Sequence, residues 1–179
     1  MSFGRPKAGK PPLDQTGLLD YAAKSLGSRM KSERDLRRLM ATRAEPGEEG
    51  RETIDAVMLK LKELGYLSDE RFAADFTRLR QENDKFGRRR VQQGLMQKGV
   101  AQATVTEAVG KAYDEVDEVA LARQYTERKR MRKPENEKET ARAMRRLMAA
   151  GFSSKAIWAV LRSWGAAVEE AELEGADDL

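Results

Sequence analysis

Basic side chains are concentrated in the stretch FGRRRVQQGLMQKGV (residues 86–100) and at the residue before it. The cations there are Lys85, Arg88, Arg89, Arg90 and Lys98. No acid lies among them. Guanidinium and ammonium groups at this density attract phosphates through Coulomb forces and counterion release, with strong dependence on salt and little on sequence. The segment therefore favours binding of a polyanion.

A second basic run spans residues 123–133, in which Glu127 is the single acid. Its cations are Arg123, Arg128, Lys129, Arg130, Arg132 and Lys133. We place Arg128, Lys129 and Arg130 among the candidate binding residues. The competing interpretation is an ordinary solvated helix face with i, i+4 ion pairs. It stays open here because Glu127 and the neighbouring acidic loops offer partners.

Similar residues recur at regular distances along the chain. LMQKGVAQATVTEAV from Leu95 aligns with LMAAGFSSKAIWAVL from Leu147, 52 residues later, and Leu39 begins the equivalent place 56 residues before Leu95. Chance similarity among helices rich in leucine, alanine and arginine is the alternative. Tandem units that stack on their neighbours also account for a composition that is 36% charged and only 6% aromatic.

This repeat places arginines at matching positions. Five residues before each anchoring leucine stand Arg34, Arg90 and Arg142. The positions two and one residue before it hold Arg37 and Arg38, Gln93 and Gly94, and Arg145 and Arg146. These positions lie largely opposite the leucine stripe, so we expect similar basic or polar faces at regular spacing. Arg142, Arg145 and Arg146 are thus the candidate patch that parallels residues 88–90.

Helices are expected to position these side chains. Leucine, methionine, alanine, glutamate and arginine dominate, no alternating strand pattern is found, and all five prolines lie outside the apolar-periodic stretches. Three helical segments are expected in each third of the chain. The predicted organisation is a flexible basic amino-terminal tail (1–16), three-helix repeats at 17–67, 68–114 and 115–166, and an acidic carboxy-terminal tail (167–179).

Single residues predict where these helices begin and how they pack. Ser32 is a predicted N-cap, and AEPGEEG (residues 44–50) is a predicted loop. Leu64 and Leu79 are placed on apolar stripes that face the core. Gly94 lies inside a predicted helix, where it either admits a close neighbour or is neutral drift, and both alternatives stay open.

Net charge is +4, but acids are concentrated at the end of the sequence. Residues 169–179, EEAELEGADDL, contain six acids and no base, so residues 1–168 carry +10. A basic body with an acidic end points to a polyanionic partner, with the acidic segment competing for the binding site or tuning it. A solubilising role is the alternative. Stronger binding to polyanions at low salt after removal of residues 169–179 would favour the first interpretation.

Cysteine and histidine are absent, which excludes disulfides, thiol nucleophiles, imidazole bases and the usual zinc sites. We expect no enzyme, no cofactor and no metal site. Asp69, Glu70 and Asp75 would be the residues of a magnesium nuclease, but their spacing suits the first turn of a helix at least as well. The longest apolar run, AIWAVL, has six residues, and the basic start of the chain has no apolar core. We therefore expect a cytoplasmic protein without a membrane or secretory segment.

The segment LKELGYLSDERFAADFTRLR (residues 61–80), followed by FGRRRVQQGLMQKGV, resembles the signature of the RecX family, whose members regulate the recombinase RecA. The resemblance rests on Gly-Tyr-Leu, an acidic pair and a Phe-Ala block, and then on basic residues, Arg-Val, Leu and Lys-Gly-Val. Weaker likeness extends over residues 18–165. Gly94 departs from the family pattern, which commonly has an acid there.

What the resemblance implies is an all-α fold of three tandem three-helix repeats in a curved, elongated, right-handed or solenoid-like array. It also implies a protein that lies in the groove of the RecA–DNA filament and limits ATP hydrolysis, strand exchange and co-protease activity in the SOS response and DNA repair. We expect a monomer that binds single- or double-stranded DNA weakly by itself. The candidate cations named above would then face the filament or its DNA.

A helix-turn-helix DNA regulator that acts without RecA is the alternative, because LMQKGVAQATVTEAV has the helix, glycine turn and helix of such proteins. In that motif the second helix reads bases with its exposed side chains. Here the charge lies on the first helix, whereas the second offers Gln102, Thr104, Thr106 and Glu107. This distribution favours contact with a nucleic-acid backbone or a protein over sequence readout.

Overall fold

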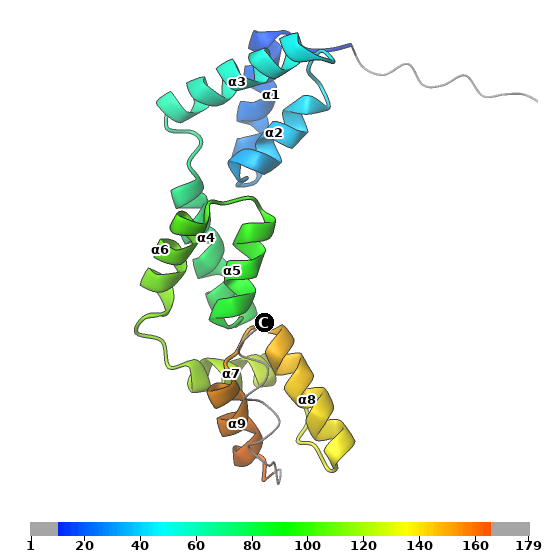
Figure 1. The fold of residues 1–179 in the computed structure, drawn as a ribbon, viewed down its shortest axis with the longest axis vertical. Helices are drawn as coiled ribbons and strands as arrows, with labels where there is room; N and C mark the ends of the chain where they lie inside the picture. The colour runs from blue at the N-terminus through cyan, green and yellow to red at the C-terminus, as the bar shows by residue number, and fades with distance from the viewer. Residues whose placement is uncertain (1–10, 166–179) are drawn as a thin grey trace, which may run out of the picture. The chain divides into compact units, whose positions relative to one another are not determined.

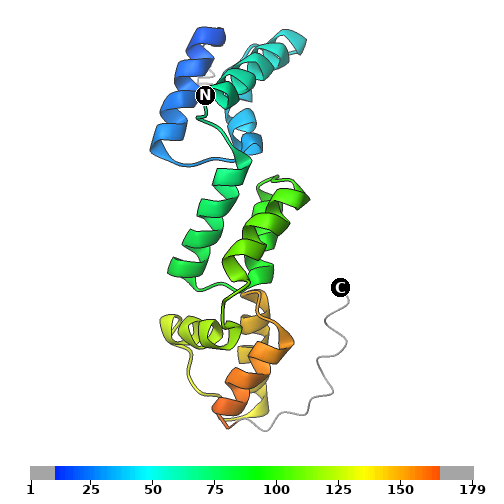
Figure 2. The same cartoon turned by 90° about the vertical axis from the view of Figure 1, so that its left-hand side faces the viewer.

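The computed structural model describes residues 11–165 and is all-α over that range (Figures 1 and 2). Its α-helices are α1 (Gln15–Ser28), α2 (Glu33–Ala41), α3 (Glu48–Glu63), α4 (Asp69–Leu79), α5 (Arg88–Gln97), α6 (Gln102–Tyr113), α7 (Glu118–Arg128), α8 (Glu137–Ala149) and α9 (Ser154–Ser163). A π-helical turn, η1 (Arg80–Asp84), continues α4. The predicted all-α fold class is confirmed. The predicted tails at 1–16 and 167–179 lie largely or wholly outside the described range.

The described helices fall three to each predicted repeat, although α1 begins at Gln15, ahead of the predicted start at residue 17. By backbone packing, the chain divides into two compact units. Over the described residues, the first comprises residues 11–72 and Lys98–Val100, and the second comprises Ala73–Gln97 and residues 101–165. The boundaries of the three repeats stay a prediction. In the described part of the chain, no helix is both long enough and apolar enough to cross a membrane.

In the first unit, α1, α2 and α3 pack against one another around a leucine-rich core. Its buried side chains are Leu18, Ala22, Leu36, Met40, Ile54, Val57, Met58, Leu61 and Leu67. Most of them recur at intervals of three and four residues, which places them on one face of each helix. The predicted burial of Leu64 is wrong, because its side chain is 51% exposed. α3 ends at Glu63, and the chain turns through Gly65 at a φ of +70°.

Helix starts in the first unit follow capping chemistry. The N–H of Asp35 donates to Oγ of Ser32 at 3.2 Å, which confirms the predicted N-cap of α2. The loop predicted at residues 44–50 is too long, because α3 begins at Glu48 with two acids in its first turn, where they suit the helix dipole. Gly50 lets this turn approach Glu45 closely: a Cβ at Gly50 would lie 1.7 Å from the carbonyl oxygen of Glu45.

In the second unit, α5 packs on α6, and α9 packs on both α7 and α8. Its buried apolar side chains include Val91, Leu95, Val105, Val109, Leu121, Tyr125, Leu147, Phe152, Ile157 and Leu161. Gly94 has a packing role, because a Cβ there would lie 3.0 Å from the ring of Phe76 on α4. The predicted burial of Leu79 is wrong, since its side chain is 37% exposed. The regular α-helix ends at Leu79, and the π-helical turn that follows does not continue the apolar stripe.

Two helix ends meet inside the second unit. The N–H of Gly87 donates to the carbonyl oxygen of Ala150 at 2.8 Å, and the N–H of Arg89 donates to that of Gly151 at 3.3 Å. Amides at the start of α5 thus donate to carbonyls at the end of α8. In an isolated helix, these terminal N–H and C=O groups would have no partner. The positive end of one helix dipole also faces the negative end of the other. We call this contact the α5–α8 joint.

Glycine is required at two positions of the α5–α8 joint. A Cβ at Gly87 would lie 2.3 Å from the carbonyl oxygen of Gly151, and a Cβ at Gly151 would lie 2.2 Å from the amide nitrogen of Arg90. Gly151 also has a φ of +88°, in the left-handed region that residues with a side chain rarely adopt. The two backbones can therefore approach this closely only because neither residue has a side chain.

A related contact lies in the first unit, at the start of α2. Oγ of Ser32 donates to the carbonyl oxygen of Lys98 at 2.7 Å. Gly99 has a φ of +79°, and a Cβ there would lie 2.6 Å from Cδ of Arg34. Arg34 and Arg90, which occupy equivalent positions in the predicted repeat, thus both lie against a glycine turn. The arginine at this position of the repeat therefore packs against a glycine turn in addition to carrying a charge.

Replacing Gly151 with alanine should destabilise the protein by about 1–3 kcal/mol, because the side chain would strain the backbone and push α5 away from the end of α8. Gly110→Ala is the matched control. Gly110 lies inside α6, where the atom nearest to an added Cβ is Nη2 of Arg88 at 3.8 Å. Alanine there should be neutral or stabilising by up to about 1 kcal/mol. Urea unfolding followed by circular dichroism measures the stability of both variants. A Gly151→Ala midpoint equal to that of the parent would contradict the requirement for glycine at this position.

Candidate anion-binding surfaces

α5 begins with three exposed arginines, Arg88, Arg89 and Arg90. Cations at a helix N-terminus oppose the helix dipole, at a cost of about 0.3–1 kcal/mol each. Four other helices have the opposite arrangement, since α2, α3, α4 and α8 each carry two acids in the first turn. The negative end of the α8 dipole faces the start of α5 across the α5–α8 joint and offsets part of this cost. The dipole of α5 itself does not account for three arginines, and their charge density favours a role in binding.

Two of these arginines make loose contacts. Nη1 of Arg88 is 3.9 Å from Oδ1 of Asp114, and the two side chains are 45% and 69% exposed. An exposed pair of this kind contributes about 0–1 kcal/mol. The guanidinium of Arg90 lies 5.8 Å from the ring centroid of Phe86, near the outer limit of a cation–π contact. Both groups keep donors available to a partner.

Arg89 and Arg90 line a surface hollow to which α8 and its glycine turn also contribute. Its lining residues are Arg89, Arg90, Gln92, Gln93, Met96, Met148, Ala149 and Gly151. Met96 and Met148 are 51% and 40% exposed, so thioethers and guanidinium groups lie on one surface. Methionine adapts to irregular apolar contacts, so this mixture suits a protein surface beside phosphates better than phosphates alone. We call it the α5–α8 hollow.

Hydrogen bonds and aromatic contacts fix the segment that leads into α5. Oη of Tyr113 donates to the carbonyl oxygen of Phe86 at 2.7 Å, and burial raises the pKa of the Tyr113 hydroxyl. The ring centroid of Phe86 lies 6.3 Å from that of Tyr125, which makes an edge-on contact with Phe152 at 5.6 Å. Lys85 has a left-handed backbone with a φ of 57°. The chain therefore enters α5 through a sharp and well-supported turn.

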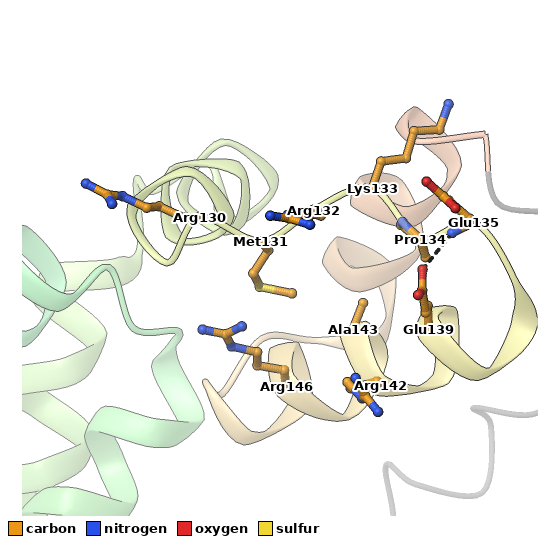
Figure 3. Close-up of a pocket in the computed structure, with 10 residues that line it drawn as sticks. All are labelled: Arg130, Met131, Arg132, Lys133, Pro134, Glu135, Glu139, Arg142, Ala143 and Arg146. Atoms are coloured by element: carbon orange, nitrogen blue, oxygen red, sulfur yellow. Dashed lines mark hydrogen bonds between the residues drawn. The ribbon is translucent and has the colours of Figure 1, made fainter.

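A second hollow, of about 490 Å³, lies between the α7–α8 loop and α8 (Figure 3). Its lining residues are Arg130, Met131, Arg132, Lys133, Pro134, Glu135, Glu139, Arg142, Ala143 and Arg146. Five of them are cationic and two are acidic, an excess of three positive charges. Figure 3 shows that residues 130–135 come from the loop, whereas Glu139, Arg142 and Arg146 stand on α8. We call it the α7–α8 hollow.

The acids of the α7–α8 hollow belong to the start of α8. The N–H of Glu135 donates to Oε2 of Glu139 at 3.0 Å, and the N–H of Glu139 donates to Oδ1 of Asn136 at 3.0 Å. This reciprocal pattern is close to a capping box and occupies the Glu139 carboxylate. Within residues 11–165, no ion pair joins a carboxylate to Arg130, Arg132, Lys133, Arg142 or Arg146. The hollow therefore keeps a concentrated positive charge.

The turn that ends α7 shapes the loop side of the hollow. Arg130 has a left-handed backbone with a φ of 49°, and the N–H of Met131 closes the turn on the carbonyl oxygen of Thr126 at 2.9 Å. Glycine is the usual residue at such a position, so arginine there costs about 1–2 kcal/mol. Lys129 is half-buried, and its carbonyl oxygen lies 3.5 Å from Nη2 of Arg146, a long hydrogen bond across the hollow.

The candidate cations thus occupy different places. Arg89 and Arg90 line the α5–α8 hollow, and Arg130, Arg142 and Arg146 line the α7–α8 hollow. Arg128 and Arg145 are exposed but line neither hollow. Lys98 belongs to the first unit, where its Nζ lies 2.7 Å from Oδ2 of Asp35. A carboxylate of the same unit already balances its charge.

Arg132 and Lys133 line the α7–α8 hollow although the sequence analysis did not select them. Both belong to the basic run at residues 123–133, so the charge excess of that run was the signal for including them. They follow the end of α7, where no helical periodicity relates them to the repeat.

The acids considered for a nuclease have separate structural roles. The N–H of Glu33 donates to Oδ1 of Asp69 at 2.8 Å, and burial raises the pKa of Asp69. The hydroxyl of Ser68 donates to Oε2 of Glu70 at 2.7 Å, which lowers the pKa of Glu70. Asp75 forms an ion pair on its own helix. The described part of the chain contains no group of three or more acidic side chains placed to hold a metal ion.

Fold and surfaces together define a small helical protein that displays arginine-rich hollows, and comparison with known proteins gives its family. Residues 68–109 match the family model described as the second three-helix domain of RecX. The chain is 34% identical over 149 residues to the regulatory protein RecX of Leptothrix cholodnii, which covers 83% of this chain and 89% of that protein. It is 38% identical over 119 residues to the regulatory protein RecX of Escherichia coli O7:K1, covering 63% and 69% of the two chains. The protein belongs to the RecX family of regulatory proteins.

Solved structures of RecX share the fold. The crystal structure of RecX from Lactobacillus salivarius matches with a TM-score of 0.65 at 16% identity, over 85% of this chain and 97% of that one. A second structure, of the regulatory protein RecX, matches with a TM-score of 0.65 at 21% identity, over 83% and 73% of the two chains. At these identities the likeness concerns the fold alone.

Stability should fall above about pH 10 through Tyr113. Burial keeps its hydroxyl protonated in the folded protein, whereas in the unfolded chain the hydroxyl ionises near the ordinary value of about 10. Ionisation then favours the unfolded state. The contribution of Tyr113 to the free energy of unfolding is therefore present below about pH 10 and is lost as the pH rises. At about pH 8, Tyr113→Phe should cost about 1–3 kcal/mol, because the Phe86 carbonyl loses its partner.

The difference in unfolding free energy between the parent and Tyr113→Phe should therefore narrow by about 1 kcal/mol between about pH 8 and about pH 11. Urea unfolding at both pH values measures it. All other titrating groups are common to the two proteins, so the difference reports on Tyr113. If this difference in unfolding free energy does not change between the two pH values, the Tyr113 hydroxyl is not held protonated by burial.

Proposed function

We propose that this protein regulates RecA by binding in the groove of the RecA–DNA filament, where it limits ATP hydrolysis, strand exchange and co-protease activity. The observation that carries the proposal is membership of the RecX family over most of the chain, combined with the arginines that oppose the dipole of α5. The curated relatives are named regulatory proteins, which supports regulation as the function. RecA as the partner, and inhibition of homologous recombination as the outcome, are the further steps of the proposal.

A RecA–DNA filament offers what the two hollows require. Its DNA presents phosphates, which would exchange their counterions for the arginines of this protein. Its protein subunits present side chains that Met96 and Met148 would contact beside those arginines. A protein held along the groove would then block access to the DNA and to other substrates of the filament. Binding should weaken steeply as salt concentration rises.

The contact residues that we propose are the candidate cations of the second unit: Lys85, Arg88, Arg89, Arg90, Arg128, Lys129, Arg130, Arg142, Arg145 and Arg146. Lys98 would contribute less, because its ammonium already pairs with Asp35. Free single- or double-stranded DNA would bind weakly through the same cations.

A combined measurement tests the function: the DNA-dependent ATP hydrolysis of RecA with and without this protein, and co-sedimentation with the filament. We expect inhibition together with co-sedimentation. Unchanged hydrolysis, with tight sequence-selective binding to duplex DNA, would overturn the proposal in favour of a helix-turn-helix regulator. The side chains of α6 make that outcome unexpected. Gln102 donates to Thr106 at 3.2 Å and Lys111 pairs with Glu107 at 2.6 Å, so these polar groups already have partners.

Changing Arg89 and Arg90 together to glutamate should weaken binding to the RecA–DNA filament about tenfold or more, equivalent to at least ~1.4 kcal/mol. The reversed charges would repel phosphates at the α5–α8 hollow. Thermal stability should hold, because both side chains are exposed and the favourable position of acids in the α5 dipole offsets their repulsion by the end of α8. Co-sedimentation at two salt concentrations measures the binding, and the melting temperature measures the fold.

Lys24→Glu with Arg51→Glu is the matched control. Both side chains are exposed in the first unit, outside the proposed contact residues, and the change in net charge is the same. An equal loss of binding in the control would show that net charge alone matters. A large fall in melting temperature of the Arg89 and Arg90 variant would show that these arginines are structural.

A further inference from the structure

The α7–α8 hollow has the composition of a site for an acidic peptide. Five cationic side chains line it, and neither of its two glutamates forms an ion pair with them within residues 11–165. Figure 3 shows Arg132 and Arg146 on either side of Met131, whereas Arg130 and Lys133 extend away from it. Like charges around one hollow repel one another, and an anion bound there reduces that repulsion. An anionic ligand would therefore stabilise this part of the molecule.

The chain itself leads to the rim of this hollow. The last described residue, Gly165, follows α9, and a Cβ there would lie 3.5 Å from Nζ of Lys133. Lys133 is one of the lining residues. An extended chain spans about 3.3–3.6 Å per residue, so the connection from Gly165 to residue 169 reaches at most about 14 Å. The segment that begins there needs no long connection to reach the hollow.

That segment has the complementary charge. Its acids are Glu169, Glu170, Glu172, Glu174, Asp177 and Asp178, and it contains no base. These residues lie outside the described range, so their chemistry is taken from the sequence. A tethered segment acts at an effective concentration of the order of millimolar, which makes even weak Coulomb attraction sufficient for docking. The α5–α8 hollow is a poorer match, since Arg89 and Arg90 are its only cations.

We propose that the α7–α8 hollow binds residues 169–179 of the same chain, and that this acidic segment competes there with polyanionic partners. The docked carboxylates would occupy Arg142 and Arg146, which the proposed function assigns to the filament contact. A filament or a nucleic acid must then displace the segment, so docking lowers the affinity of the α7–α8 hollow and sets a threshold for binding. Docking itself requires no partner, and only its regulatory consequence rests on the proposed function.

Zero-length carbodiimide crosslinking of the full chain at low salt, read by peptide mass spectrometry, tests the docking. We expect amide links from Lys133 to the acids of residues 169–179. Tethering alone could bring the segment near Lys133, so the decisive comparison is Arg142→Gln with Arg146→Gln. This variant keeps the tether and weakens the hollow, and the yield of these crosslinks should fall about fivefold.

Two further variants sharpen the comparison. Arg130→Gln with Arg132→Gln removes two other cations of the hollow and should have the same effect, which guards against misfolding of the first variant. Arg38→Gln with Arg51→Gln removes two exposed cations of the first unit and should leave the yield unchanged. Equal yields in the parent and both hollow variants would overturn the docking.

The regulatory consequence has its own measurement. Replacing the six acids with their amides should raise the affinity of the full chain for a single-stranded oligothymidine at low salt about fivefold. The gain should be lost when Arg142 and Arg146 are also glutamine. An unchanged affinity would overturn the competition. Neither experiment contains RecA, so failure here is distinguishable from failure of the RecA assay.

Discussion

The amide of Gly87 and the carbonyl of Ala150 meet at 2.8 Å, and the geometry of the second unit depends on this contact. It gives the unsatisfied end of α5 a partner at the end of α8, and it requires two backbones to approach without side chains between them. Gly87 and Gly151 make that approach possible. Because the joint brings the start of α5 to the end of α8, Arg89, Arg90 and Met148 come to line one hollow.

Charge at the start of α5 runs against the needs of its helix. α2, α3 and α8 begin with acids, as the helix dipole favours, whereas α5 begins with arginines. Arg130 likewise occupies a left-handed position that glycine would fill at lower cost. The negative end of α8 offsets only part of the cost at α5, so the needs of the individual helices do not explain these cations. An anionic partner, as the proposed function requires, would account for them.

Positive hollows and an acidic segment in one chain also suggest how such binding is limited. A protein with an excess of ten positive charges over residues 1–168 would attract any nucleic acid in the cell. An intramolecular anion that covers the α7–α8 hollow would suppress this weak, unspecific attachment more than binding to a partner with many phosphates and a shaped groove. Selectivity would then come from competition, without a base-reading surface.

The sequence alone determined the fold class, most helix ends and the positions of the cations, because caps, glycine stops and three- and four-residue apolar spacing act between neighbours in the chain. It did not determine that Leu64 and Leu79 are exposed, because the helical stripe ends where the backbone turns. Nor did it determine that Gly94 makes room for Phe76 or that Lys98 pairs with Asp35, since these contacts join distant residues. Tertiary structure also placed Arg89 and Arg90 in one hollow and Arg130, Arg142 and Arg146 in another. It added Arg132 and Lys133 to the second hollow, because only packing decides which charged side chains face one another.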